Sequence, residues 1–308
     1  MEVCGEHPFF AMEMDQIAAF LEVAQLHSFS RAAEKLYRTQ PAISAQIRSL
    51  EQELHQKLFD RSGRKIFLTP AGEILFEYGL KLQAMHRETM QRVRETRDEI
   101  AGSIVVGANE ATCLYVLPNV FAEYKRKYPQ VAIEIYHNFS HKIIQRMNEH
   151  QVDLGIVTLP VTQKNIKVIP LHEDEVHVVL PAKHPLAKRA SLKIEDLVSE
   201  PLILPKGGHT RDLLERIFRK YRNRLQISME LASVESIKKF VGAGLGISLL
   251  TRSYATMETK TGVLKLVPIQ GLKIVRRVGL AYKTDRQLSR AAQAFWDVVA
   301  SMPSQFLH

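Results

Sequence analysis

The pattern of apolar positions predicts a helix at residues 14–26. Ile17, Phe20, Leu21 and Ala24 fall on one face of that helix, and the opposite face is polar. This is the spacing of an amphipathic helix that packs one side against a core. The N-terminal part of the chain is therefore expected to begin with a helix that needs partners.

Two further helices are predicted next, joined by a short turn. Ser28 can cap the first and Thr39 the second, because hydroxyl groups accept hydrogen bonds from the free N–H groups of a helix N-terminus. Pro41 falls in the first turn of the second helix, where its missing N–H costs little. Apolar residues then follow at intervals of four, three and four: Ile43, Ile47, Leu50 and Leu54. Two helices of this kind, the second with a polar, exposed start, form the helix-turn-helix that reads DNA.

Residues 58–68 are two short apolar segments around a basic tip that contains glycine, which predicts a small hairpin wing. Thr69 and Pro70 suit the start of a long helix, which we expect to reach about Ile100. Apolar or small positions along it alternate at intervals of four and three: Ala71, Leu75, Tyr78, Leu82, Met85 and Thr89. Such a seam favours pairing with a second copy of the helix. The alternative is a helix packed on its own domain.

From Ser103 onward, short apolar runs alternate with helical patterns. The predicted strands are 104–107, 131–136, 152–157, 176–180, 202–204, 247–250 and 279–282. The predicted helices are 117–128, 143–147, 213–221 and 235–241. This alternation indicates an α/β fold. The glycines of residues 242–246 follow a helix and precede a strand, the reverse of a nucleotide-binding turn, so they are interpreted as a helix end.

The net charge of +9 invites a nucleic-acid interpretation, but the charge is not where the helix-turn-helix lies. Residues 1–100 carry 13 basic and 15 acidic side chains, whereas residues 101–308 carry 29 and 18. Within residues 27–65 there are eight basic and four acidic side chains. The prediction of DNA binding therefore depends on this local patch and not on the bulk charge.

Other classes of protein are disfavoured by the sequence. Apolar runs fall short of the roughly 18 residues of a membrane span, and the N-terminus lacks the pattern of a signal peptide, so a cytoplasmic protein without membrane association is expected. Cys4 and Cys113 give neither a disulfide framework nor a metal spacing, and a redox thiol has little support. Motifs for catalysis or metal binding are absent. Neither an enzyme nor a cofactor is expected.

Several segments together resemble the LysR-type transcriptional regulators. The specific ones are residues 28–33 (SFSRAA), 39–44 (TQPAIS), 58–61 (LFDR) and 68–72 (LTPAG); looser matches are 117–118 (LP), 153–156 (DLGI), 184–187 (HPLA) and 242–247 (GAGLGI). The resemblance runs from Met14 to about Pro303. Residues 1–13 lie outside it as an N-terminal extension, either a tail or a start assigned too early, with Met12 or Met14 as the first residue.

The resemblance implies a winged helix-turn-helix at 14–71, a dimerising linker helix at 72–102 and an effector domain at 103–303. That domain is expected to have the two-lobed shape of a type 2 periplasmic binding protein. Lobe I would take about 103–170 and 268–303, and lobe II about 171–267. The implied partners are double-stranded operator DNA, a small metabolite between the lobes, further copies forming a dimer through the linker helix and then a tetramer, and RNA polymerase.

The DNA contacts that the family pattern and the local charge imply are Ser30, Arg31, Arg38, Thr39, Gln40, Pro41, Ser44, Ala45, Arg48, Arg61 and Arg64. Gln40 can bond an adenine edge through two hydrogen bonds. The arginines are expected on phosphates, with Arg64 in the minor groove, although any of them could be an ordinary surface charge. Ala45 stands where the family often has arginine, which removes one base reader.

The expected effector site collects residues where strands lead into helix N-termini: Asn109, Ala111, Thr112, Thr158, Gly208, His209, Thr210 and Arg211. Free N–H groups and the helix dipole attract anions at such places. With Arg211 and Lys206 nearby, an anionic metabolite is the hypothesis, while the alternative is that Thr158 and Thr210 only cap helices. Two other functions stay open at this point: a solute-binding module without a role in transcription, and an enzyme with an attached DNA reader.

Overall fold

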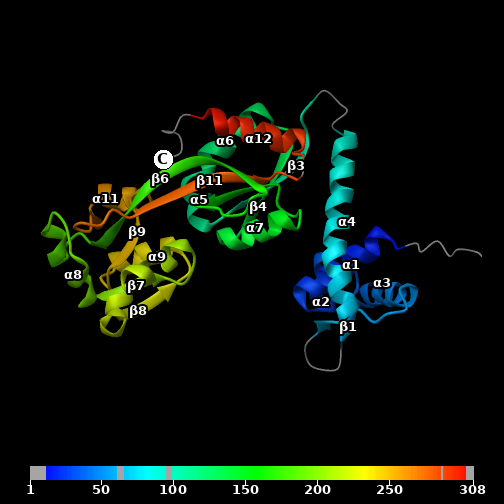
Figure 1. Cartoon of the computed structure of the whole chain (residues 1–308), viewed down its shortest axis with the longest axis horizontal. Coiled ribbons are helices and arrows are strands. Elements are labelled where there is room, and N and C mark those ends of the chain that lie inside the picture. The colour runs from blue at the N-terminus through cyan, green and yellow to red at the C-terminus, as the bar shows by residue number, and fades with distance from the viewer. Residues whose placement is uncertain (1–11, 61–65, 95–98, 286, 303–308) are drawn as a thin grey trace, which may run out of the picture. The chain divides into compact units, whose positions relative to one another are not determined.

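The computed structural model describes residues 12–60, 66–94, 99–285 and 287–302. The chain divides into two compact units, one formed mainly by the residues up to Val93 and one that begins at Arg94 (Figure 1). Within the described residues, none of the helices combines the length and the apolar character that crossing a membrane requires. Each unit is described on its own.

The N-terminal unit is three helices, a two-stranded hairpin and a long helix. Its elements are α1 (Met14–Leu26), α2 (Phe29–Lys35), α3 (Gln40–Glu53), β1 (Phe59–Asp60), β2 (Phe67–Leu68) and α4 (Pro70–Arg94). The predicted caps are present: Ser28 Oγ accepts from the N–H of Arg31 at 3.2 Å, and Thr39 Oγ1 accepts from the N–H of Ala42 at 3.4 Å. The stripe of α3 is fully buried at Ile43, so the predicted helix-turn-helix is confirmed.

The long helix differs from the prediction in two ways. It ends at Arg94, and Glu99 and Ile100 are not helical. Ile100 packs instead against the core of the C-terminal unit, which takes it out of the seam. At the other end, Leu75 is only 9% exposed and lies in the core of its own domain. The seam therefore splits: its first turns follow the alternative of packing on their own domain, and the later turns stay exposed.

The C-terminal unit is α/β, as predicted. Its strands are β3 (Gly102–Ala108), β4 (Val131–His137), β5 (Leu154–Thr158), β6 (Ile166–Pro181), β7 (Pro201–Pro205), β8 (Gln226–Leu231), β9 (Ser248–Thr251), β10 (Leu264–Val267) and β11 (Val275–Lys283). Its α-helices are α5 (Glu110–Tyr115), α6 (Leu117–Lys127), α7 (Ser140–Asn148), α8 (Ile194–Val198), α9 (His209–Ile217), α10 (Val234–Gly242), α11 (Thr256–Lys260) and α12 (Arg290–Ser301). Short 3₁₀ segments are η1 (Pro185–Lys188), η2 (Arg219–Arg224) and η3 (Arg252–Ala255).

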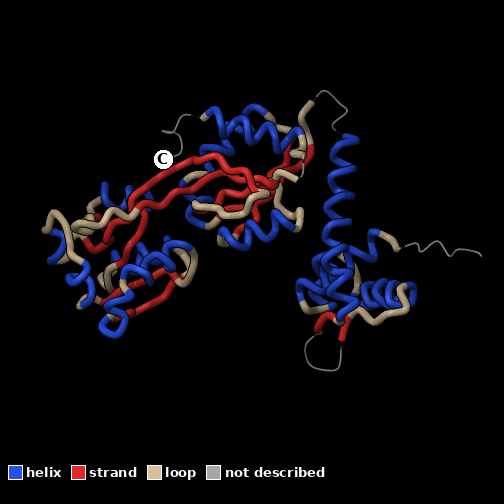
Figure 2. The backbone as a smooth tube through the Cα atoms, viewed as in Figure 1, coloured by secondary structure: helices blue, strands red, loops and turns tan. Residues whose placement is uncertain are grey.

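Two lobes share the long strand β6. The strand order of the main sheet is β10-β6-β11-β5-β3-β4, with β9 also paired to β6, while β7 and β8 form a separate parallel pair. We call β3 to β5 with α5 to α7 and α12 the first lobe, and β7 to β10 with α8 to α11 and η3 the second lobe. The first half of β6 pairs with β11, and its second half pairs with β9 and β10. The long strands β6 and β11 therefore connect the two lobes (Figure 2).

Some predicted elements were wrong in their bounds. Strand β6 begins at Ile166 and not at 176, and β11 begins at Val275 and not at 279. Charged residues occupy the first part of each strand, so the apolar pattern there is interrupted. Some of these residues pair across the two strands, as Arg277 does with Glu173, and the sequence alone does not reveal such a pair. The helix expected at 213–221 is α9 followed by η2. Basic side chains spaced three and four residues apart along residues 216–224 repel one another, which disfavours one continuous α-helix there.

Candidate functional site

The start of α3 presents the polar side chains that were predicted to meet DNA. Gln40, Pro41, Ala45 and Arg48 are exposed, and Ser44 is half-buried. Gln40 Nε2 donates a 2.8 Å hydrogen bond to Ser44 Oγ, one helical turn further on. This contact holds the amide over the exposed face of the helix, in a fixed position from which it can bond a base edge.

Other predicted DNA residues surround this surface. Ser30 and Arg31 are exposed on α2, and Thr39 is the cap of α3. Arg38 is exposed but already forms a 2.8 Å ion pair with Asp15. Sequence reasoning missed an exposed aromatic residue at this place. Tyr37 is 97% exposed in the turn before α3 with a φ of 53°, and nothing local in the sequence marks it.

The wing strands β1 and β2 pair, with Phe59 opposite Leu68. The predicted contacts Arg61 and Arg64 lie outside the described residues. Thr69 Oγ1 donates a 2.5 Å hydrogen bond to the carbonyl of Lys57, which closes the base of the hairpin. The wing is therefore anchored on the side that faces its own domain.

A cavity of about 340 Å³ lies between the two lobes of the C-terminal unit. Six of the predicted effector residues line it: Asn109, Ala111, Thr158, Gly208, His209 and Thr210. The first lobe contributes the start of α5 and the end of β5, and the second contributes the start of α9. Strand ends and helix N-termini thus meet at one place, as the topology of an α/β fold favours.

Two predicted residues, Thr112 and Arg211, do not line this cavity. Thr112 is fully buried inside α5, where its N–H donates to Asn109 Oδ1 at 2.9 Å. The guanidinium of Arg211 forms ion pairs with Glu215 at 2.7 Å and Glu230 at 2.5 Å. Its charge is already neutralised away from the cavity, so Arg211 is not carried forward as an effector residue. Neither is Lys206, which is exposed and does not line the cavity either.

Sequence reasoning missed the cation that does line the cavity. Arg276 on β11 is 7% exposed and donates a hydrogen bond to the hydroxyl of Tyr254, a second lining residue. The guanidinium carbon lies 5.7 Å from the centroid of the Tyr254 ring. Within the described residues, Arg276 forms no ion pair with a carboxylate. An arginine inside an apolar strand was the available signal, but its partner lies far away in the sequence.

Two other titratable side chains that line the cavity are His209 and Glu110. Burial lowers the pKa of His209, and the positive charges of Arg276 and Arg216 lower it further, so its imidazole is neutral at pH 7. The Glu110 carboxylate accepts hydrogen bonds from the Ser233 hydroxyl and from a backbone N–H of the second lobe. Hydrogen bonds from these neutral donors stabilise its negative charge without cancelling it. Asp212, in the first turn of α9, brings a second carboxylate to the cavity. Among the described residues that line the cavity, Arg276 is the side chain with a permanent positive charge.

Cys113 on α5 is half-buried and not in a disulfide. Burial raises the pKa of its thiol, and the charge of Glu110 raises it further. A thiol with a raised pKa is a poor nucleophile at neutral pH. Redox sensing at Cys113 therefore gains no support; Cys4 lies outside the described residues.

Comparison with known proteins assigns both units. Residues 14–73 match the bacterial regulatory helix-turn-helix protein family of lysR type, and residues 97–303 match the LysR substrate binding domain. The chain belongs to the LysR family of transcriptional regulators. The two matches confirm the expected helix-turn-helix and the expected effector-binding domain. Members of this family are regulators and not enzymes. A solute-binding module without a role in transcription is excluded by the N-terminal match.

Several relatives of this LysR regulator have been described. A probable RuBisCO transcriptional regulator of Trichormus variabilis is 34% identical over 289 residues, covering 92% of this chain and 86% of the relative. Another with the same name from Synechocystis is 33% identical over 92% and 84%. A full-length OxyR variant from Pseudomonas aeruginosa covers 95% of this chain and 96% of its own, with 26% identity and a TM-score of 0.66. CbnR complexed with its target DNA, at 17% identity, 94% and 99% coverage and a TM-score of 0.67, shares the fold.

Proposed function

We propose that this LysR regulator responds to a small anionic metabolite held between its two lobes. The observation that carries the proposal is Arg276. A buried charge without an opposite charge is strongly disfavoured, and among the described residues this guanidinium has only the neutral hydroxyl of Tyr254 as a hydrogen-bond partner. An anionic ligand would supply the missing charge through paired hydrogen bonds.

The start of α9 supports the same ligand chemistry. Gly208 precedes this nine-residue helix and, having no side chain, leaves the first N–H groups of the helix uncapped. Such N–H groups bind carboxylates and phosphates. Thr158, Thr210 and Ser140 bring hydroxyl groups to the same cavity. The proposed effector residues are thus Asn109, Ala111, Thr158, Gly208, His209, Thr210 and Arg276.

Calorimetry tests this function. The full-length protein is titrated with a panel of small carboxylates and phosphate esters, each beside a neutral analogue of the same shape. We expect heat from at least one anion and a loss of at least roughly tenfold in affinity in Arg276→Gln, since a charged hydrogen bond is removed. The matched control is Arg277→Gln, the next residue on the strand, which is exposed and paired with Glu173. No heat from any anion, or equal affinity in Arg276→Gln, would exclude the proposal.

DNA recognition is proposed to use the exposed start of α3. Gln40 and Ser44 would contact base edges, and Arg31, Arg38 and Arg48 would contact phosphates. The support is the exposure of Gln40 and of the three arginines, together with the contact between Gln40 and Ser44. The proposed site of action is the cytoplasm, where operator DNA is reached, and RNA polymerase at the promoter is proposed as a further partner.

Self-association through α4 is also proposed. Large apolar side chains stay exposed on its outer face: Ile74 at 63%, Tyr78 at 58%, Leu82 at 38% and Met85 at 66%. Apolar residues at this spacing are normally covered by a second helix. Met85→Glu should therefore shift the protein towards monomers in sedimentation velocity, whereas His86→Gln, an exposed neighbour, should not. A tetramer would need a second interface in the C-terminal unit.

A further inference from the structure

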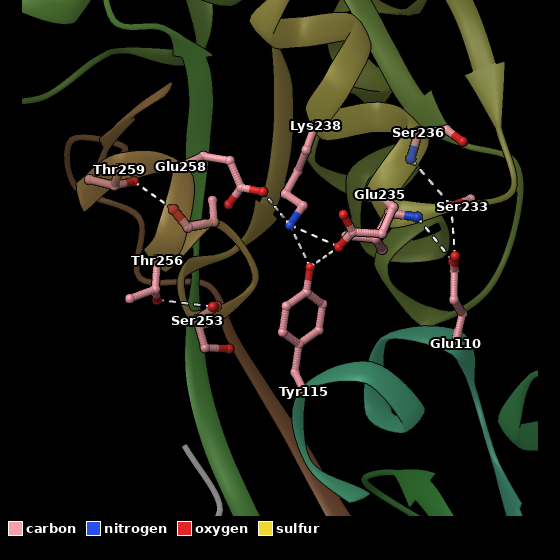
Figure 3. Close-up of polar contacts among 12 residues, drawn as sticks. Glu110, Tyr115, Ser233, Glu235, Ser236, Lys238, Ser253, Thr256, Glu258 and Thr259 are labelled. Atoms are coloured by element: carbon pink, nitrogen blue, oxygen red, sulfur yellow. Dashed lines mark hydrogen bonds and ion pairs between the residues drawn. The ribbon is translucent and has the colours of Figure 1, made fainter. Parts of the chain in front are cut away.

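The two lobes are joined at both ends of the short helix α5. At its start, the carboxylate of Glu110 reaches the second lobe, where it accepts a 2.6 Å hydrogen bond from the Ser233 hydroxyl and a 3.0 Å hydrogen bond from the N–H of Val234 (Figure 3). Val234 is the first residue of α10. A side chain of the first lobe therefore caps a helix of the second lobe, and its negative charge stabilises that N-terminus.

At the other end of α5, the hydroxyl of Tyr115 lies between Lys238 and Glu235, both on α10 (Figure 3). The ammonium group of Lys238 donates to this hydroxyl at 2.5 Å, and the hydroxyl donates in turn to Glu235. Burial raises the pKa of Tyr115 to about 12, helped by the bond to Glu235, so the phenol keeps its proton at neutral pH. The chain of donors and acceptors across the lobes is thus complete.

Lys238 is the centre of this cluster. Its side chain is 5% exposed, and it forms ion pairs of 2.8 Å with Glu235 and 2.7 Å with Glu258. Burial alone lowers the pKa of Lys238, but the bonds to Glu235, Glu258 and Tyr115 raise it above its ordinary value, so the charge is kept. Separating the lobes would remove the hydroxyl of Tyr115 from this cation. It would also remove the Glu110 carboxylate from the N-terminus of the helix that carries the cation, which would keep only its own cap, Ser233.

The contact between α5 and α10 is also a wall of the effector cavity. Glu110 and Ala111 of α5 and Val234 and Ile237 of α10 line it. The ring of Tyr115 stacks on that of Tyr254 with centroids 4.9 Å apart and an angle of 18°. Tyr254 lines the cavity and meets Arg276 there. The cavity wall and the interlobe contact are therefore one continuous set of packed groups.

We propose that α5 and α10 form an interlobe latch that keeps the two lobes closed over the cavity before any ligand binds, with Tyr115 and Lys238 as its positioning residues. The ligand then enters a cavity that already exists, and it does not have to draw separate lobes together. The latch concerns the lobes themselves and does not depend on the charge of the ligand. Its test can therefore be made on the ligand-free protein.

Hydrogen exchange followed by mass spectrometry provides that test. The full-length, ligand-free protein is compared with Tyr115→Phe, which keeps the ring stack but loses the hydroxyl, and with Lys238→Met. If the latch exists, both variants exchange several-fold faster in peptides of α5 and of α10, one in each lobe, because the lobes open more often. The control is Lys239→Met, the exposed next residue, which should exchange like the unchanged protein.

Two results would overturn the latch. One is faster exchange in Lys238→Met that is confined to α10 and α11, because a purely local role of the lysine predicts no effect in α5. The other is unchanged exchange in Tyr115→Phe, which retains the fold even if Lys238→Met does not. In the double variant, Tyr115→Phe should add less to the exchange rate than it does alone, since the bond between Lys238 and Tyr115 is already lost in Lys238→Met and the bond from Tyr115 to Glu235 remains to be lost. A failure of anion binding in calorimetry would leave these results unaffected.

Discussion

The carboxylate of Glu51 accepts a 2.9 Å hydrogen bond from the backbone N–H of Leu58. Glu51 is on the last turn of α3 and is 5% exposed, and Leu58 directly precedes the first wing strand. The same oxygen also accepts from the N–H of Phe59 at 3.4 Å. One buried side chain therefore fixes the wing relative to the helix that is proposed to read DNA.

Replacing Glu51 with alanine should lower the free energy of unfolding of the N-terminal unit by about 1–3 kcal/mol, the range for buried backbone donors that lose their acceptor. Glu51→Gln keeps one acceptor oxygen and should lose less. Urea unfolding followed by circular dichroism measures both. Gln52→Ala, an exposed neighbour on the same helix, is the control and should change little. Equal stability of Glu51→Ala and Gln52→Ala would contradict the prediction.

The N-terminal unit was predictable from the sequence because its signals are local. A cap such as Ser28 acts on a residue three positions away, and the stripe through Ile43 shows within one helix. The cavity was only partly predictable. Helix starts such as Gly208 can be recognised where a strand runs into a helix. Arg276 could not be recognised, because Tyr254 and the first lobe meet it only through the pairing of β11 with β6 and β5.

Gln40→Ala should weaken operator binding about 5- to 100-fold, as expected for the loss of a side chain that forms two bonds to a base. The loss should be largest for the base pair that Gln40 reads, with the dependence on salt unchanged. Arg48→Ala should instead weaken binding to all sequences and reduce the slope of log affinity against log salt by about one. Gel shifts at several salt concentrations separate the two. Reversed behaviour of the two variants would reassign their roles.

Gly155→Ala should destabilise the first lobe by about 1–3 kcal/mol, the usual cost of overpacking a core. A Cβ atom at this position would lie 2.7 Å from Ile143 Cγ2 and 2.7 Å from Met147 Sδ, both on the buried face of α7. Gly207→Ala is the control, since its Cβ meets only the Phe139 ring at 3.6 Å. The double variant Gly155→Ala with Ile143→Ala should lose less stability than the sum of the losses in the two single variants, because the shortened side chain makes room for the new Cβ atom. Simple additivity in thermal or urea unfolding would show that the contact is not the cause.

His209 should make the C-terminal unit less stable at acidic pH. Its pKa is lowered in the folded state, first by burial and then by Arg276 and Arg216. The unfolded state therefore takes up a proton more readily as the pH falls through about 6.5. Stability falls in that window and levels off below the folded-state pKa. His209→Gln should flatten the decline between about pH 7 and pH 5 in urea unfolding. His86→Gln, an exposed histidine on α4, should leave it in place.

The same histidine should couple effector binding to proton uptake. An anion beside Arg276 offsets the positive charge that lowers the pKa of His209, so the bound state should hold the proton more strongly than the empty cavity. Calorimetry with an anion that binds, repeated near about pH 6 in buffers of different ionisation enthalpy, measures the protons taken up. We expect net uptake in the unchanged protein and none in His209→Gln. A binding enthalpy that is independent of the buffer would mean that the anionic group lies away from both Arg276 and the start of α9, where His209 is the first residue, and would contradict the proposed site.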